Sequence, residues 1–310
     1  FQTVALQWHA VRSSNWSSDH AANVLRKLEK DVFPHIGTKE ISAITVSQLH
    51  ELLTLIQDRN ALDIAGRVRS ICGQVFLFGM QLDKCSTNPA ERLKGALKTR
   101  RTEHFAAIEP DDIPRLLSSL EKNDARLYLR TIRAIRLSLL TFVRPGELRQ
   151  AKWSEINLEK QEWIIPADRM KSRRSHIVPL ATQAVEILNK QREETKLLKT
   201  DLVFPSQIDE VNPMSDGTVR VALHKLGFKG QMTAHGFRAL ARTAIREMLD
   251  YEADIIEAQL AHKPSGSLGA AYDRAQFLKE TRKMMQKRAD YLDKQAQKMS
   301  LQKTNLRINY

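Results

Sequence analysis

Apolar residues recur at helical spacing through the first hundred residues of the chain. Ser17 and Ser18 stand where an N-cap is expected before one such run. Thr45 and Gln48 have the spacing of a capping box before another. A third run is expected to bury a face made up of Ile64, Val68, Ile71, Val75 and Leu82. Because no run alternates as a half-buried strand would, residues 1–98 are predicted to form a small all-helical domain.

A longer helical pattern follows at residues 125–142. Its apolar face is expected to consist of Leu129, Ile132, Leu139 and Leu140, and Tyr128 is expected to pack within the helix. The same segment carries a basic stripe of Arg126, Arg130 and Arg133. A solvated face is the favoured interpretation of this stripe, and DNA contact is the weaker alternative.

One segment of the second half has a β pattern. Residues 161–167 and 175–180 are short apolar runs on either side of a basic tip, which predicts a β-hairpin. Helices are expected elsewhere, including a polar, lysine-rich helix at 276–298. The predicted fold class is therefore mainly α with a small β-hairpin or sheet, in two domains. Their expected bounds are 1–98 and 108–300, with a basic linker at 99–107 and a tail at 301–310.

The net charge of the chain indicates what kind of partner it binds. The chain has 49 Lys and Arg against 36 Asp and Glu, a net charge of +13 that is spread over both parts. Such an excess is expected of a protein that binds nucleic acid, although a basic protein without that partner stays an alternative. A basic cluster near the linker fits either a solvated connector or a strap over a phosphate backbone; it consists of Lys94, Lys98, Arg100 and Arg101.

Several functional classes are disfavoured by the composition. No run of about 18 apolar residues predicts a membrane span, and the first residues do not resemble a signal peptide. Cys72 and Cys85 form no CxxC pair, which favours a reducing cytoplasm over a disulfide framework. The histidines lack metal-ligand spacing, so we expect neither a metal nor another cofactor. The chain does not begin with methionine, which predicts that it belongs to a longer or processed protein.

Four short stretches carry candidate chemistry. Arg144 stands at a predicted helix end in RPGE, where Glu147 is expected to begin the next helix. His235 and Arg238 share one face at the start of another helix, with Thr233 as the candidate cap. His262 ends a helix before a Lys-Pro pair, and Tyr272 follows among small residues. Each stretch alone is a weak or moderate signal.

Taken together and in this order, the stretches RPGE, RMKSRRSHIVPL, HGFR, QLAHK and AAYDRA resemble the tyrosine recombinase (phage integrase) superfamily. They look most like prophage and genomic-island integrases, and the resemblance covers nearly the whole chain. It implies a helical domain that binds core-site DNA, followed by a mixed α/β catalytic domain. Such integrases usually begin with a further small DNA-binding domain, which is not recognisable here.

The resemblance also implies roles for individual residues. Tyr272 would be the nucleophile, Arg144 and Arg238 would clamp the scissile phosphate, and His235 would act as acid and base. His262 would donate a hydrogen bond to the phosphate, and Glu147 would orient Arg144 or His235. DNA contacts are expected from the linker cluster and the hairpin tip, at Lys94, Lys98, Arg100, Arg101, Arg173 and Arg174.

The general acid is expected in the basic tip of the hairpin. Four cationic side chains stand there: Arg169, Lys171, Arg173 and Arg174. An arginine cannot donate a proton near neutral pH, whereas an amine can. Lys171 is therefore the candidate, and it is in register with the hairpin lysine of the family.

The implied function is site-specific DNA recombination through a covalent 3′-phosphotyrosyl intermediate, which integrates or excises a mobile element. A catalytically silent DNA-binding regulator and a type IB topoisomerase-like nicking–closing enzyme are the alternatives. The implied partners are double-stranded DNA and three further copies of the chain, joined through the C-terminal helix. Whether the free chain is a monomer is left open, as is help from DNA-bending or directionality proteins. The expected location is the bacterial cytoplasm, at the nucleoid.

Overall fold

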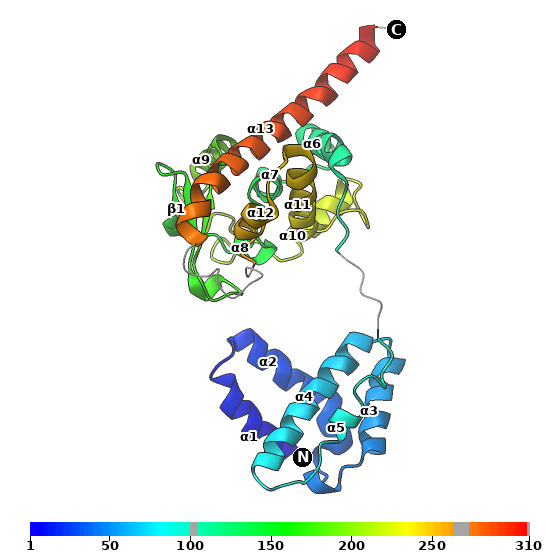
Figure 1. Cartoon of the computed structure of the whole chain (residues 1–310). Coiled ribbons are helices and arrows are strands. Elements are labelled where there is room, and N and C mark those ends of the chain that lie inside the picture. The colour runs from blue at the N-terminus through cyan, green and yellow to red at the C-terminus, as the bar shows by residue number, and fades with distance from the viewer. Residues whose placement is uncertain (100–104, 263–272, 309–310) are drawn as a thin grey trace. The chain divides into compact units, whose positions relative to one another are not determined.

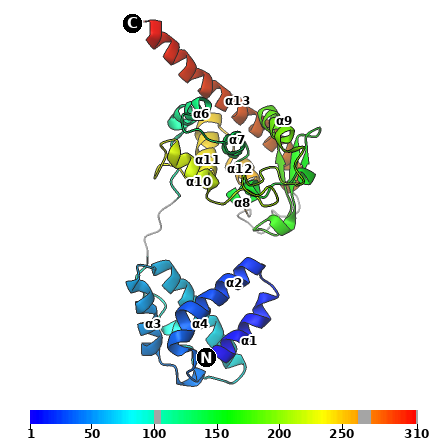
Figure 2. The same cartoon turned by 180° about the vertical axis from the view of Figure 1, so that it is seen from behind.

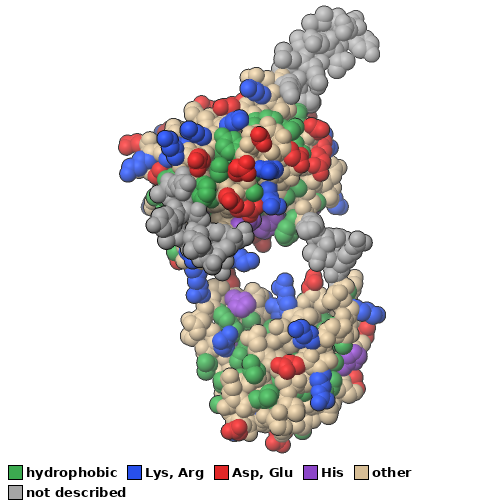
Figure 3. All heavy atoms as spheres, viewed as in Figure 1, with side chains coloured by type: hydrophobic (Ala, Val, Ile, Leu, Met, Phe, Trp, Pro, Cys, Tyr) green, Lys and Arg blue, Asp and Glu red, His purple; other side chains and the backbone are tan. Residues whose placement is uncertain are grey.

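The computed structural model describes residues 1–99, 105–262 and 273–308, apart from the side chains of 273–276 and 298–308. The chain divides into two compact units, Phe1–Glu103 and His104–Tyr310 (Figures 1 and 2). Lys and Arg side chains are dispersed among acidic and apolar ones on the face of each unit that Figure 3 displays. No helix among the described residues is long and apolar enough to cross a membrane.

The first unit is helical throughout its described residues. Its elements are α1 (Gln2–Ser13), α2 (Ser18–Lys27), η1 (Leu28–Gly37), η2 (Ile41–Ala43), α3 (Val46–Asp58), α4 (Leu62–Gln81) and α5 (Pro89–Arg92). The predicted caps are confirmed. The Ser17 side chain accepts a hydrogen bond from the His20 amide, and Thr45 and Gln48 form a reciprocal capping box.

The core of this unit lies along α4, which packs against α1, α3 and α5. Val68, Ile71 and Val75 are buried as predicted. The predicted face was wrong at both ends, because Ile64 and Leu82 are exposed. Ile64 lies in the first turn of α4 and Leu82 is its C-cap, so neither sits in the central turns that the neighbouring helices cover.

The second unit surrounds one larger core. Its helices are η3 (Pro110–Asp112), α6 (Ile113–Lys122), α7 (Leu129–Thr141), α8 (Pro145–Arg149), η4 (Trp153–Glu155), η5 (Ala167–Arg169), α9 (Thr182–Thr195), α10 (Thr218–Lys225), α11 (Gly236–Leu249), α12 (Ala253–Gln259) and α13 (Asp273–Ile308). Its strands are β1 (Ile156–Asn157), β2 (Glu162–Ile165) and β3 (His176–Pro179).

The predicted hairpin is confirmed by the antiparallel pair β2–β3, in which Trp163 is opposite Val178. Both of these residues are fully buried. The sequence did not predict β1, which pairs with β2 and completes a sheet in the order β1-β2-β3. A strand of two residues is too short to show an alternating pattern.

Two arginines of the basic stripe, Arg130 and Arg133, pack into the protein on α7, whereas Arg126 is exposed before this helix. Nη1 of Arg130 donates to the carbonyls of Pro205 (2.9 Å) and Ser206 (3.0 Å), and its Nε donates to Glu194 at 3.1 Å. Arg133 pairs with the same glutamate on α9. The solvated interpretation was therefore wrong for Arg130 and Arg133, which join α7 to α9 and to the loop that follows it.

The start of α7 also differs from the prediction. The helix begins at Leu129, and Tyr128 is its N-cap with 66% of its surface exposed. Tyr128 was expected to pack within the helix, and Leu129 was expected to be buried, but both are exposed.

The last helix, α13, packs on its own unit. It contacts α6, α7, α9, α11 and α12 and crosses them in both views (Figures 1 and 2). Its buried side chains include Met284, Met285, Arg288 and Leu292. The described part of the lysine-rich segment thus covers its own unit.

Candidate active site

The C-terminal end of α7 supports the candidate site. Phe142 ends the helix in the left-handed conformation, with φ of 41°. Three carbonyls of this end accept hydrogen bonds from side chains of other helices: Leu139 from Arg288, Thr141 from Gln259 and Phe142 from Arg238. The last carbonyls of a helix have no partner within it, so these bonds satisfy them and fix the chain just before Arg144.

Arg144 is the N-cap of α8. Glu147, at the third position of this helix, reaches back and accepts from both the Arg144 amide and its Nη1, each at 2.8 Å. Glu147 was expected to begin the helix, but Pro145 begins it. Of the two residues that Glu147 was expected to orient, Arg144 is the one it contacts.

His235 and Arg238 lie at the start of α11. His235 is the N-cap, and the Thr233 hydroxyl accepts from the Gly236 amide at 3.0 Å. Nη1 of Arg238 donates to the Phe142 carbonyl at 2.9 Å. Its Nη2 donates to the Leu260 carbonyl at 2.7 Å, so the guanidinium is anchored to two segments.

Burial and the nearby Arg144 lower the pKa of Arg238 to about 10. The group stays cationic at neutral pH. Because the two cations lie close enough for each to disfavour the charge of the other, the arrangement favours a further anion between or beside them. Glu147 and Glu257 offset this repulsion in part.

His262 meets Arg238 at this place. Its Nε2 lies 3.2 Å from Nη2 of Arg238, and its Nδ1 contacts the Glu257 carboxylate. A guanidinium can only donate, so Nε2 of His262 accepts and the ring proton lies on Nδ1, where it is donated to Glu257. Both nitrogens of the imidazole are therefore oriented by charged partners. Glu257 was not among the residues that the sequence analysis singled out.

His235 is covered on one face by an aromatic ring. The Phe105 ring stacks on its imidazole with centroids 4.7 Å apart and planes inclined by 20°. Although part of His235 is exposed, burial of the rest is the largest cause that lowers its pKa, followed by the charges of Arg238 and Arg144. The neutral imidazole, which can accept a proton, is therefore favoured.

His176 is a third histidine near the arginines, and it was not proposed as a site residue from the sequence. It begins β3 and is mostly buried, and its Nε2 donates to the Gln259 carbonyl at 2.9 Å. Burial lowers its pKa to about 4, with smaller effects of Glu147 in the opposite direction and of the two arginines. The neutral ring thus joins the hairpin to the end of α12. Its only signal in the sequence is its place at the start of an apolar strand.

The hairpin tip places the remaining candidates at the surface. Lys171, Arg173 and Arg174 are exposed in the turn before β3. Arg169, by contrast, is mostly buried, where it pairs with Glu155 and donates to the Glu147 carbonyl at 2.6 Å. Arg169 therefore anchors the tip beside α8.

Several predicted site residues lie outside the described part of the chain: Tyr272, Arg100 and Arg101. Lys94 and Lys98 are exposed on the first unit. The described residues contain no group of His, Cys, Asp and Glu that could hold a metal ion.

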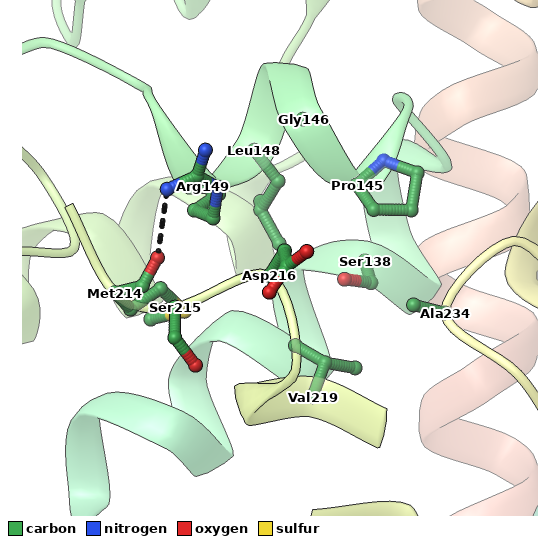
Figure 4. A pocket seen from close by; sticks show the side chains of 10 residues that line it. All are labelled: Ser138, Pro145, Gly146, Leu148, Arg149, Met214, Ser215, Asp216, Val219 and Ala234. Carbon is green, nitrogen blue, oxygen red and sulfur yellow. Dashed lines mark hydrogen bonds between the residues drawn. The ribbon is translucent and has the colours of Figure 1, made fainter. Parts of the chain in front are cut away.

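A small cavity adjoins the motifs that contain Arg144 and His235. It encloses about 140 Å³, and Figure 4 shows the ten side chains that line it. Pro145, Gly146 and Ala234 belong to this lining, and Arg149 crosses it to donate to the Met214 carbonyl at 3.2 Å. Neither Arg144 nor His235 lines the cavity, so it lies beside the site and does not contain it.

Two family models match the chain, one in each of its two units. Residues 1–96 match the family described as "Phage integrase central domain", and residues 106–279 match "Phage integrase family". The integrase of Enterobacteria phage P4 is 36% identical over an aligned length of 328 residues. The alignment covers 100% of this chain and 74% of that protein. The prophage integrase IntZ of Escherichia coli (strain K12) is 39% identical over 295 residues, 94% of this chain and 71% of that protein.

Among solved structures, a lambda integrase tetramer bound to a Holliday junction matches with a TM-score of 0.65. It is 18% identical, and the match covers 87% of this chain and 79% of that one. At this identity the match shows that the fold is shared. The family and relative matches show more: the chain belongs to the phage integrase family, and it is a site-specific DNA recombinase.

Proposed function

We propose that Tyr272 cuts DNA in this recombinase and holds the strand as a covalent 3′-phosphotyrosyl intermediate while a mobile element is integrated or excised. The supporting observation is the meeting of Arg144, Arg238 and His262, which belong to three separate segments. Two guanidinium groups beside one another repel unless an anion joins them. A scissile phosphate is an anion of the right kind.

In the proposed step, Oη of Tyr272 attacks the phosphorus and forms a P–O bond, while the bond from phosphorus to the 5′ oxygen breaks. His235 accepts the phenol proton, and Lys171 donates a proton to the leaving 5′ oxygen. Arg144 and Arg238 stabilise the additional negative charge on the non-bridging oxygens. Rejoining reverses each of these transfers.

His262 is proposed to donate to a non-bridging oxygen once the phosphate is bound. In the DNA-free arrangement its Nε2 accepts from Arg238, so donation requires a proton on that nitrogen. The Glu257 carboxylate at Nδ1 holds the ring in its orientation. Glu147 is proposed to keep the Arg144 fork in place from the other side of the cluster.

The first domain, 1–98, is proposed to hold core-site DNA, with 99–107 as the linker to the catalytic domain at 108–300. Backbone contacts are assigned to exposed or linker cations: Lys94, Lys98, Arg100, Arg101, Arg173 and Arg174. We propose that four chains act together on two duplexes through the C-terminal helix. The inner face of α13 is buried up to Gln295, so this contact would use later residues, including the tail at 301–310.

A suicide substrate tests the chemistry. This is a core-site duplex nicked so that the 5′-hydroxyl product diffuses away. Wild type is expected to accumulate a covalent protein–DNA adduct, and Tyr272→Phe, which lacks only the phenol oxygen, is expected to form none. Tyr128→Phe is the matched control, because Tyr128 is an exposed tyrosine with no role in the step, and it is expected to behave as wild type.

Other outcomes assign other functions. An adduct that persists in Tyr272→Phe overturns the assignment of the nucleophile. Wild-type protein that binds the site without forming an adduct indicates a silent regulator. Relaxation of any supercoiled plasmid, whatever its sequence, indicates nicking–closing activity of the type IB kind.

A further inference from the structure

The linker end, defined here as residues 105–107, lies against the start of α11. The Ala106 carbonyl accepts two hydrogen bonds from Thr233, one from its amide at 2.9 Å and one from its hydroxyl at 3.2 Å. A Cβ at Gly236 would lie 2.4 Å from the same carbonyl and 3.2 Å from the Ala107 Cα. Only glycine allows the two backbone segments to approach this closely, so the linker end has a fixed place on the HGFR motif.

This placement puts Phe105 on the catalytic histidine. The two rings are 4.7 Å apart and nearly parallel, which limits rotation of the imidazole about its long axis. Yet 64% of the Phe105 surface is exposed, so the ring buries little area of its own. A large apolar side chain that is mostly exposed contributes little to folding. Its contact with His235 is what distinguishes it from an ordinary core residue.

We infer that Phe105 is a positioning residue for His235, holding the imidazole in one orientation and shielding it from water so that it stays neutral and able to accept the phenol proton. This inference rests on the proposed role of His235. The charged groups that face His235 are Arg238 on its own helix and Arg144 at the start of α8. The linker end contributes Phe105 and two alanines, and hence no charge.

The effect of losing Phe105 on the cleavage rate should therefore depend on pH. Loss of Phe105 lets water reach the imidazole, so the largest cause that lowers its pKa is weakened. The pKa then rises towards its ordinary value of 6.5. More of the histidine is protonated at mildly acidic pH, where it cannot act as a base. At alkaline pH the ring is neutral with or without Phe105.

Single-turnover cleavage of the suicide substrate by the full chain tests this, at saturating DNA and across the pH range. Phe105→Ala is expected to lower the rate about two- to fourfold near pH 6 and less than about twofold near pH 8.5. Phe105→Tyr restores a flat ring and is expected to recover the wild-type profile. Tyr128→Ala removes an aromatic ring that is about as exposed as that of Phe105. We expect it to leave the cleavage rate unchanged at both acidic and alkaline pH.

Two further measurements separate this inference from the proposed function. In a His235→Gln background, Phe105→Ala is expected to have no further effect, because its target is gone. In the DNA-free protein, the His235 ring signal in NMR is expected to titrate at higher pH in Phe105→Ala than in wild type. This second readout does not depend on cleavage, so it remains informative if wild type forms no adduct.

An equal loss of rate at every pH overturns the inference, as does a loss of rate that persists in His235→Gln. A His235 titration that is unchanged or that moves to lower pH in Phe105→Ala also overturns it. The last of these outcomes would mean that the aromatic face stabilises the imidazolium more than burial disfavours it.

Discussion

Nη2 of Arg238 lies 3.2 Å from Nε2 of His262, although 24 residues separate them in the chain. The contact orders the proton of His262, because the arginine can only donate to it. The other ring nitrogen, Nδ1, contacts Glu257, so this carboxylate also helps to orient His262. The three side chains form a series of contacts, from the Arg238 guanidinium through His262 to the Glu257 carboxylate.

Replacement of Glu257 by glutamine should lower the rate of DNA cleavage about tenfold. This is less than the loss expected when a positioned acid or base is removed altogether. The amide keeps the size of the side chain but replaces the carboxylate that contacts Nδ1 of His262, so the ring is held less firmly. The rate of adduct formation at saturating DNA measures this effect. Affinity for the core site, measured by gel shift, should change little.

Arg242→Gln is the matched control. Nε of Arg242 also pairs with Glu257, at 2.8 Å, but its side chain is largely exposed. Its loss should leave His262 oriented and the rate within about twofold of wild type. If both variants lower the rate equally, the effect belongs to the ion pair and not to the histidine.

His176 should make the stability of the protein depend on pH. Its pKa is about 4 in the folded protein, below the ordinary 6.5, with burial as the largest cause. The unfolded chain therefore binds this proton more readily. The stabilisation is fully present above pH of about 6.5 and is lost as the pH falls towards 4, at a cost of about 2 kcal/mol by pH 5.

Urea unfolding of wild type and His176→Gln at pH 7 and pH 5 measures this dependence. The glutamine amide can still donate to the Gln259 carbonyl but does not titrate. The variant should lose less stability between the two pH values than wild type does. Equal losses in the two proteins would place the titrating group elsewhere.

The parts of the fold that the sequence predicted are those with local causes. The capping box at Thr45 and Gln48 depends on residues three apart, and the hairpin depends on two neighbouring apolar runs. Arg130 was misjudged because its acceptors lie 64 to 76 residues further along the chain. No spacing rule within a helix distinguishes a solvated arginine from one that a distant glutamate and two carbonyls neutralise.

The same distinction between local causes and contacts of distant segments applies to the site. Motif resemblance indicated Arg144, Arg238 and His262, and the structure brings them together. It could not indicate His176, whose partner lies 83 residues away, nor the Phe105 ring on His235. These contacts arise from how the hairpin and the linker end pack on α11 and α12. The roles of Tyr272 and Lys171 stay predictions.

The buried part of the basic stripe yields a stability prediction. Arg130→Ala should destabilise the protein by about 2 to 3 kcal/mol, because it leaves two buried carbonyls without their donor, while Glu194 keeps its pair with Arg133. Arg126→Ala, a change in the same stripe at an exposed residue before α7, should stay within about 0.5 kcal/mol of wild type. Denaturant unfolding measures both. Similar effects of the two changes would restore the solvated interpretation.

A methyl group at Gly236 should separate the linker end from α11. The new Cβ would lie 2.4 Å from the Ala106 carbonyl, and a backbone atom cannot move aside as the end of a side chain can. Gly236→Ala is therefore expected to break the bonds from Thr233 to Ala106 and to lift Phe105 from His235. Cleavage should then fall most at acidic pH.

Gly66→Ala supplies the control for adding a methyl group to a helix. Nothing lies within 4 Å of a Cβ at Gly66, in the interior of α4, so alanine should stabilise that helix by about 0.5 to 1 kcal/mol. Cleavage by this variant should match wild type at every pH. If Gly236→Ala instead leaves the pH profile unchanged while Phe105→Ala shifts it, Phe105 reaches His235 without the fixed approach of the Ala106 carbonyl.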